Sequence, residues 1–383
     1  MSWETQSYIR CASLCSRACE CKELAILGLV LLFSSYVATH NILLPKLLGP
    51  HSVGTVSFEL INTPYSPPRD LMLYAHYPTT KACSCEYPLA RDFSPTFGKW
   101  LDAFDNFTHS DRIVTRVHES APISSSKFPI LLFGPGYGEP VQLSGRHTMS
   151  NLASQGYVVI GVNHPNDSEI IEYPDGRVVY YQENENITDF DQLIPSVEAR
   201  VSDMNFLASQ LRNTSVTDNI PGLKDGFDFE SIGTLGFSLG GASAATAMID
   251  NPIYACGANM DGAFIENVTE IGLDKPFFMM NSLTHTWPTD DTWPTFYHNL
   301  RGFKKDIQVS GTRHKAYSDW LILKNLLVKN DTDPANANLL FGTGLIEISN
   351  AYLTSFFDMC LKNGTGELLQ GPSEAFPEVA FLS

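Results

Sequence analysis

The stretch SIGTLGFSLGGASAATA, residues 231–247, passes from an apolar run into a serine flanked by glycines, and then into small residues. This pattern predicts a strand over 231–236 and a helix over 242–249. A sharp strand-to-helix turn strains the residue at its tip, and glycines are needed beside it because strand and helix approach too closely for side chains. Gly236 and Gly240 occupy those positions around Ser238. The pattern predicts a nucleophile at Ser238, with a structural turn as the alternative.

The chain after residue 48 alternates between strand-like and helix-like segments. The apolar runs Phe128–Phe133 and Tyr157–Val162 are typical of strands covered on both faces. Residues 80–127 are interpreted as a long irregular insertion, and no linker divides 48–383, so we expect one α/β domain with a doubly wound, mostly parallel sheet and helices on both faces. Other strands are expected at Val53–Leu60, Leu71–Tyr77, Val178–Tyr181, Ile253–Met260, Pro276–Asn281 and Asp306–Ser310, and helices at Arg146–Ser154, Ser196–Leu211, Ala316–Leu327 and Ile346–Leu361.

Composition limits the class of protein. The chain has 383 residues, of which 43% are apolar, so it can bury a sizeable core. Its formal net charge of −17 is spread along the sequence, and nucleic acid is therefore not expected as a partner. We find no metal-binding motif and no phosphate-binding loop that ends in Lys-Ser/Thr, so no metal or other cofactor is expected. The oligomeric state is left open.

The first 45 residues differ from the rest. Residues 1–23 are rich in cysteine and contain Arg10, Arg17 and Lys22, and the segment 24–45 contains the uncharged apolar run Leu24–Ala38. The basic residues before the run predict that the N-terminus faces the cytosol. The run is shorter than the roughly 20 residues of a spanning helix. The 23 residues before the run are long for the start of a cleaved signal peptide. An uncleaved signal-anchor is therefore favoured over a cleaved signal and over a buried helix. The following domain would then be luminal or extracellular, anchored or secreted.

Sequons and cysteines agree with export. Sequons for N-glycosylation exceed the about two or three that composition predicts, and glycans require luminal surface. Cysteines before the apolar run would be reduced and open to acylation, whereas a metal site there lacks a nearby histidine. Cysteines after the run could form disulfides, whose pairing the sequence leaves open. The sequons begin at Asn106, Asn166, Asn186, Asn213, Asn267, Asn330 and Asn363; the cysteines are Cys11, Cys15, Cys19 and Cys21 before the run and Cys83, Cys85, Cys256 and Cys360 after it.

A serine nucleophile requires a base, because its hydroxyl is hardly ionised at neutral pH. In hydrolases with this strand–turn–helix motif, an acid and then a histidine follow the serine along the chain. Only His285, His298 and His314 follow Ser238. His314 comes after a predicted strand and a glycine turn, at the sheet edge where such folds place active sites. We therefore predict His314 as the base and expect His285 and His298 to be pocket or surface residues.

The acid that orients the histidine has more than one candidate. Asp261 directly follows the predicted strand after the nucleophile, whereas Asp290 and Asp291 lie one strand later, where many hydrolases place this group. The residues alone favour Asp261 only slightly.

An oxyanion needs two backbone N–H donors. One is expected at Leu239, directly after the nucleophile, and the other at Tyr137 in the glycine-rich segment 134–138, although that segment also fits an ordinary turn. The aromatic residues predicted to line the substrate pocket, with core packing as the alternative, are Trp287, Trp293, Phe296 and Tyr297.

These motifs together resemble the plasma-type platelet-activating factor acetylhydrolases, a phospholipase A2 group with an α/β-hydrolase fold. The likeness spans about residues 49–361 and depends on the order of GPHSVGTVSFEL, FGPGYG, GYVVIGVNHP, GFSLGG, MDG, PFFMMNS and GTRHKAYSDW. The resemblance implies a triad of Ser238, Asp261 and His314, with Tyr137 and Leu239 as oxyanion donors. It also implies calcium-independent hydrolysis of a short or oxidised sn-2 acyl chain of a phospholipid, at a membrane or lipid surface.

The sequence departs from the family pattern at two positions. Pro135 stands where many relatives have histidine in the oxyanion loop, and Leu283 stands where relatives often have an acidic residue. Backbone donors survive the first change, and the second leaves the substrate contacts of that loop open. Two other functions remain open at this point: a general carboxylesterase or polyester hydrolase of the same fold, and a binding module without catalytic activity.

Overall fold

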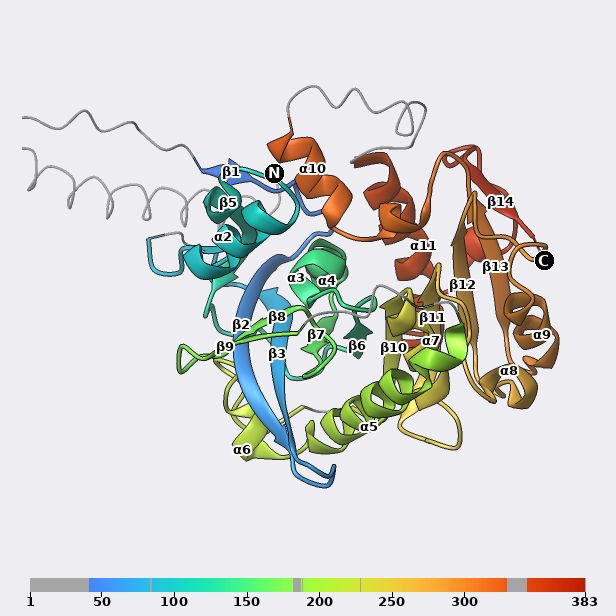
Figure 1. Cartoon of the computed structure of the whole chain (residues 1–383), viewed down its shortest axis with the longest axis horizontal. Helices are drawn as coiled ribbons and strands as arrows, with labels where there is room; N and C mark the ends of the chain where they lie inside the picture. The colour runs from blue at the N-terminus through green and yellow to red at the C-terminus, as the bar shows by residue number, and fades with distance from the viewer. Residues whose placement is uncertain are drawn as a thin grey trace, which may run out of the picture.

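The computed structural model describes residues 41–82, 85–181, 187, 189–227, 229–328 and 343–382 (Figure 1). Twelve strands of this part of the chain form one sheet, and β8 (Ile170–Glu172) and β9 (Val178–Tyr180) form a separate ribbon. The strands of the main sheet are β1 (Ile42–Leu43), β2 (Ser52–Asn62), β3 (Arg69–Thr79), β4 (Leu89–Arg91), β5 (Ile113–Glu119), β6 (Ile130–Gly134), β7 (Val158–Asn163), β10 (Ile232–Phe237), β11 (Tyr254–Met260), β12 (Phe277–Ser282), β13 (Lys304–Val309) and β14 (Val379–Phe381).

The main sheet is mostly parallel. Its order is β1-β5-β2-β3-β7-β6-β10-β11-β12-β13-β14, with β4 paired to β5. The central run from β7 to β13 is parallel throughout, whereas β2, β3 and β14 pair with antiparallel neighbours. Parallel strands require crossover connections, which helices provide here. The predicted α/β fold with one doubly wound, mostly parallel sheet is confirmed.

Helices cover both faces of the sheet (Figure 1). One core cluster contains side chains of α4 and α11, and a second contains side chains of α5, α7 and α9. Along β12, Phe277 and Met279 belong to the second cluster and Phe278 and Met280 to the first, as expected for a strand buried on both faces. The helices are α2 (Pro95–Phe104), α3 (Val141–Ser144), α4 (Arg146–Ser154), α5 (Ile194–Gln210), α6 (Thr214–Thr217), α7 (Leu239–Ala247), α8 (Val268–Ile271), α9 (Thr292–Asn299), α10 (Trp320–Leu327) and α11 (Thr343–Leu361), and the short 3-10 turns are η1 (Ser110–Arg112), η2 (Phe190–Leu193), η3 (His314–Tyr317) and η5 (Glu367–Leu369).

Two segments differ from the prediction. The expected irregular insertion at 80–127 contains β4, α2, η1 and β5. Ser94 caps α2 by accepting a hydrogen bond from the Phe97 N–H, and Pro95 fits the first turn of a helix. The helix expected at Ala316–Leu327 is interrupted after Tyr317, and α10 begins only at Trp320.

The N-terminal predictions fall outside the described residues. Residues 1–23, the run Leu24–Ala38 and the sequons at Asn186 and Asn330 belong to the part of the chain that is not described. Among the described helices, none combines the length and the apolar character needed to cross a membrane.

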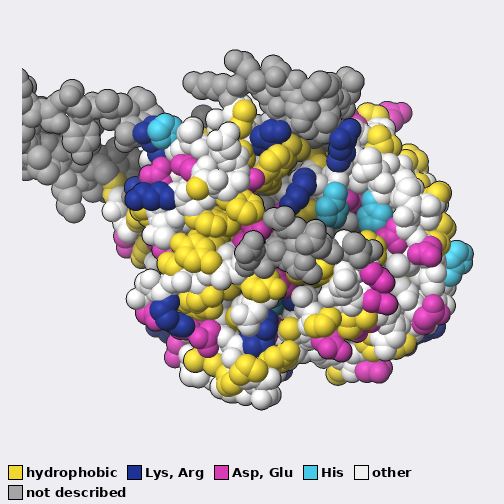
Figure 2. Space-filling model, viewed as in Figure 1, with side chains coloured by type: hydrophobic (Ala, Val, Ile, Leu, Met, Phe, Trp, Pro, Cys, Tyr) yellow, Lys and Arg dark blue, Asp and Glu magenta, His cyan; other side chains and the backbone are white. Residues whose placement is uncertain are grey.

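Asp and Glu side chains are scattered over the face in Figure 2 and do not gather in one patch.

A disulfide joins Cys256 in β11 to Cys360 near the end of α11. The two cysteines are 104 residues apart in sequence, so the bridge closes a long loop in the unfolded chain. We expect the double variant Cys256→Ala/Cys360→Ala to lose about 2–5 kcal/mol of unfolding free energy. Urea denaturation of the two proteins measures this difference, and equal midpoints and slopes would show that the bridge does not stabilise the fold.

Candidate active site

Ser238 lies at a strained turn between β10 and α7. Its φ of 54° and ψ of −126° are unusual for a residue with a side chain, and such conformations cost about 1–3 kcal/mol. The backbone is fixed on both sides, because the Ser238 N–H donates to the Met260 carbonyl at 2.9 Å and the Gly241 N–H donates to the Ser238 carbonyl at 2.8 Å. The structure therefore has the geometry that the opening motif predicts.

The flanking glycines are required by close approach of the backbone. A Cβ at Gly236 would lie 2.2 Å from the carbonyl carbon of Gly240, and a Cβ at Gly240 would lie 2.0 Å from the carbonyl oxygen of Gly134. Neither contact is possible without movement of the strand or the helix.

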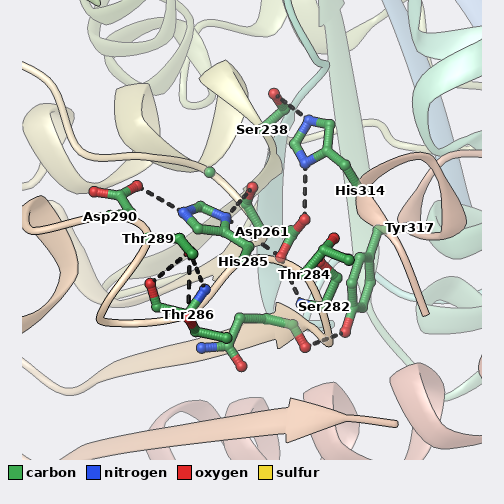
Figure 3. A network of polar contacts seen from close by, with 12 residues as sticks. Ser238, Asp261, Ser282, Thr284, His285, Thr286, Thr289, Asp290, His314 and Tyr317 are labelled. Atoms are coloured by element: carbon green, nitrogen blue, oxygen red, sulfur yellow. Dashed lines mark hydrogen bonds and ion pairs between the residues drawn. The ribbon is translucent and has the colours of Figure 1, made fainter. Parts of the chain in front are cut away.

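Three side chains predicted from the sequence form a continuous line of hydrogen bonds (Figure 3). The Ser238 hydroxyl is 2.9 Å from His314 Nε2, and His314 Nδ1 is 2.8 Å from Asp261 Oδ2. Each residue follows a different strand, since Ser238 comes after β10, Asp261 after β11 and His314 after β13. The sheet thus brings together residues 53 and 76 positions apart at the carboxyl ends of its strands.

Burial differs sharply along this line. The Asp261 side chain is 0% exposed, whereas the His314 side chain is 46% exposed and its ring packs against Phe237. Burial acts to raise the pKa of Asp261, but hydrogen bonds from His285 and His314 outweigh it and lower that pKa below its ordinary value. Asp261 is therefore ionised at neutral pH and protected from solvent, while the imidazole of His314 is accessible from outside. Histidine side chains reach the surface on the face shown in Figure 2.

The rival acids have other positions. Asp290 is hydrogen-bonded to His285 and not to His314, and Asp291 directly precedes α9 at an exposed position. Among the three acidic candidates, only Asp261 has a hydrogen bond to His314.

The loop 134–138, predicted to supply an oxyanion donor, is fixed by a buried ion pair. Arg200 of α5 is 0% exposed and donates to the carbonyls of Pro135 and Gly136, the latter at 3.0 Å. Asp167 accepts from Arg200 Nε at 2.6 Å and from the Gly138 N–H at 3.3 Å. A buried arginine with two carboxylate contacts and two carbonyl contacts defines the loop conformation closely.

This arrangement determines the direction of the Tyr137 N–H. The Gly136 carbonyl and the Tyr137 N–H belong to one planar trans peptide unit, so they point in opposite directions. Because Arg200 binds that carbonyl, the Tyr137 N–H points away from Arg200. Tyr137 and Leu239, the two predicted donors, pack in the same small apolar cluster, and Leu239 is the first residue of α7.

The predicted pocket residues divide into two pairs. Trp293 and Phe296 are buried in the core, where both rings pack against Phe264. The structure thus favours core packing over pocket lining for these two. Trp287 is partly buried and donates through its indole N–H to Asp306 at 2.7 Å, and Tyr297 packs against Trp287.

The contacts that His285 and Arg200 make in this region were not predicted from the sequence. His285, expected only as a pocket or surface residue, contacts Asp261 on the side away from His314 (Figure 3). His298 is exposed on α9. By residue type, Asp261, His285 and His314 could hold a metal ion, since their ligand atoms lie within 4.8 Å of one another. Hydrogen bonds within the cluster already engage the ring nitrogens of both histidines.

A serine hydroxyl beside an imidazole that is held by a buried carboxylate is the arrangement that activates serine for attack on acyl carbonyls. Donors directed at the developing negative charge complete such a site.

Comparisons with known proteins show which families and folds this chain is similar to. Residues 180–355 match the model of the family described as platelet-activating factor acetylhydrolase, isoform II, and this range includes Ser238, Asp261 and His314. A relative from Arthroderma benhamiae, named probable 1-alkyl-2-acetylglycerophosphocholine esterase, is 28% identical over 273 residues. That alignment covers 66% of this chain and 66% of the relative, just under two thirds of the relative's length.

A solved structure shows the same fold. The ferulic acid esterase from Streptomyces cinnamoneus superposes with a TM-score of 0.75 at 23% identity, and the match covers 90% of this chain and 100% of that one. The fold is therefore that of the α/β-hydrolases, and over residues 180–355 the chain is similar to the platelet-activating factor acetylhydrolase family.

Proposed function

We propose that the protein is a serine esterase that cleaves a carboxylic ester through an acyl-enzyme. The observation that carries the proposal is the line of hydrogen bonds from Ser238 through His314 to the buried Asp261. The family match and the name of the fungal relative support the same class of reaction.

In the first half of the proposed reaction, the Ser238 oxygen attacks the ester carbonyl while His314 Nε2 accepts the hydroxyl proton. The ester C–O bond then breaks, and His314 returns the proton to the leaving alcohol. In the second half, His314 takes a proton from water, whose oxygen attacks the acyl carbonyl carbon. The bond between that carbon and the Ser238 oxygen then breaks, His314 returns the proton to the Ser238 oxygen, and the acid is released. Asp261 keeps His314 Nδ1 protonated and stabilises the imidazolium that forms twice in each cycle.

The negative charge on the carbonyl oxygen is stabilised by the N–H groups of Tyr137 and Leu239. Leu239 begins α7, so the helix dipole adds to its donor strength. Arg200 fixes the direction of the Tyr137 N–H through the Gly136 carbonyl.

The proposed substrate is a phospholipid of the platelet-activating factor type with a short or oxidised sn-2 acyl chain, and no calcium takes part. The family description and the relative's name support this choice over a general carboxylesterase. The test is hydrolysis of glycerophosphocholines with sn-2 chains from acetyl to palmitoyl, beside simple aryl esters, with and without EDTA. We expect a preference for acetyl and no effect of EDTA; equal rates across all chain lengths and aryl esters would contradict the proposed specificity.

A prediction follows for the oxyanion loop. The variant Arg200→Lys keeps the charge but cannot make all four contacts, so we expect kcat to fall by about 10- to 100-fold. Rates are measured per active site titrated with a serine-reactive phosphonate. Arg212→Lys, at an exposed arginine just beyond the same helix, is the matched control and should stay within about twofold. A wild-type kcat for Arg200→Lys would show that Arg200 does not orient the donor.

We also propose that the domain lies in a luminal or extracellular compartment, behind an N-terminal signal-anchor or signal peptide. The Cys256–Cys360 disulfide supports an oxidising compartment. The asparagines of the described sequons, Asn106, Asn166, Asn213, Asn267 and Asn363, are all exposed. Glycosidase digestion of the protein from its native host should increase its mobility on a gel, and no change would count against this location.

A further inference from the structure

Asp261 is contacted by two histidines, one on each side (Figure 3). His314 binds one carboxylate oxygen, whereas His285 Nδ1 lies 3.1 Å from the Asp261 backbone carbonyl and 3.4 Å from the other carboxylate oxygen. The second nitrogen of His285, Nε2, lies 2.6 Å from Asp290 Oδ2. A line of contacts therefore continues beyond the three residues of the proposed reaction to His285 and Asp290.

The partners of His285 define its protonation state. A backbone carbonyl and an ionised carboxylate accept hydrogen bonds and cannot donate them. Both ring nitrogens of His285 face such acceptors, so both contacts are satisfied only when both nitrogens carry a proton. Asp290 is in turn fixed by Thr292, whose N–H and hydroxyl both donate to Asp290 Oδ1, at 2.9 Å and 2.6 Å. His285 is therefore an imidazolium held between two carboxylates.

Asp261 needs this support because its backbone is strained. Its φ of 60° lies in the left-handed region, which is unfavourable for a residue with a side chain. The Ser282 N–H binds the Asp261 carboxylate, and His285 is the side chain that binds its carbonyl. Since the His314 contact depends on where the Asp261 carboxylate points, restraint of the Asp261 backbone also restrains His314.

We propose that His285 is a second, cationic histidine of the active site, which together with Asp290 positions Asp261 and thereby His314. The proposal rests on the proposed esterase function and extends it. His285 takes no part in bond making, and its contribution is to orientation and to the balance of charge around Asp261.

The positive charge on His285 depends on the pH. Burial would lower the pKa of His285, but hydrogen bonds and charges of Asp261 and Asp290 outweigh it and raise the pKa to about 9. The other titratable groups around this cluster include His314 and Tyr317 of η3 and Asp306 of β13. Burial raises the pKa of Tyr317 further above its ordinary range and that of Asp306 to about 7. The Trp293 ring of α9 packs against His285 without charge. Because the pKa of His285 is raised in the folded protein, its contribution is fully present below its ordinary pKa of 6.5 and is lost as the pH rises through about 9.

The test compares the pH dependence of kcat in wild type and in His285→Gln, per active site titrated with a serine-reactive phosphonate. The wild-type kcat should fall as the pH rises through about 9. In His285→Gln we expect kcat to be about 10- to 100-fold lower at pH 7, with KM within about threefold, and no fall near pH 9. A merely structural role would lower the titrated concentration of active sites and leave the kcat of each site and its pH profile unchanged.

Two further variants make the test specific. Asp290→Asn keeps the shape of the side chain but removes the charge that supports the imidazolium, so the alkaline fall should move to lower pH. His298→Gln changes an exposed histidine on α9 and should keep both the wild-type kcat and the wild-type profile. If His285→Gln does not fold, Asp290→Asn decides the test alone.

A wild-type kcat and pH profile in titrated His285→Gln, or in Asp290→Asn, would overturn the proposal. That result is distinguishable from failure of the proposed function. If Ser238→Ala loses hydrolysis while His285→Gln keeps the wild-type kcat and pH profile, only the role of His285 is rejected. Full hydrolysis by Ser238→Ala would reject the serine mechanism itself.

Discussion

Replacing Ser238 by alanine is expected to lower kcat for ester hydrolysis by about 10⁴- to 10⁶-fold, while the protein remains folded. The hydroxyl is the only group of Ser238 that contacts His314, and its removal leaves no nucleophile at the turn between β10 and α7. The residual rate would come from the oxyanion donors acting on water. The measurement is the rate of acetate release from an sn-2 acetyl glycerophosphocholine.

The matched control for this variant is Ser209→Ala, at an exposed serine on α5 whose hydroxyl donates to the Phe206 carbonyl and accepts from the neighbouring Gln210 side chain. We expect its kcat to stay within about twofold of wild type. Retention of more than a tenth of wild-type activity per mole of purified, folded Ser238→Ala would show that Ser238 is not the nucleophile.

Asp261→Asn is expected to lower kcat by about 10³- to 10⁴-fold, with little change in KM. The amide is neutral and can present a donor to His314 Nδ1, which favours the wrong tautomer of the ring and no longer stabilises the imidazolium. The same substitution also removes a charge facing His285. Steady-state kinetics at pH 7 measure the effect.

Asp291→Asn is the control for Asp261→Asn, because Asp291 was a candidate acid in the sequence and is exposed in the structure. It should leave kcat within about twofold of wild type. The reverse result, with Asp291→Asn inactive and Asp261→Asn active, would mean that the acid lies one strand later than the structure indicates.

The fold could be predicted largely because its central strands are buried on both faces. β6 and β7 are apolar runs that end in Gly134 and Asn163, and β10 leads directly into the glycine-flanked Ser238, so their positions follow from the sequence. The region 80–127 could not be predicted in the same way, because β4 has three residues and β5 mixes apolar residues with Thr115, Arg116 and His118. Very short strands, and strands that mix polar with apolar residues, give little periodic signal.

The candidate site was predictable where one short motif places a residue. Ser238 follows from its glycines, and His314 from its place after a strand. The residues alone favoured Asp261 over Asp290 only slightly, because both follow strands, and the folded chain shows that the carboxylate of Asp261 contacts His314. The contact between Arg200 and the loop 134–138 could not be predicted from the sequence. It joins Arg200 to Pro135, 65 positions away, and an arginine in a helix usually faces solvent.

The most direct test of the account is to label the folded protein with a serine-reactive fluorophosphonate and to identify the modified residue by peptide mass spectrometry. We predict one label per chain, on Ser238, with loss of esterase activity in proportion to labelling and no labelling of Ser238→Ala. Stoichiometric inactivation with the label on any other residue would contradict the proposed mechanism.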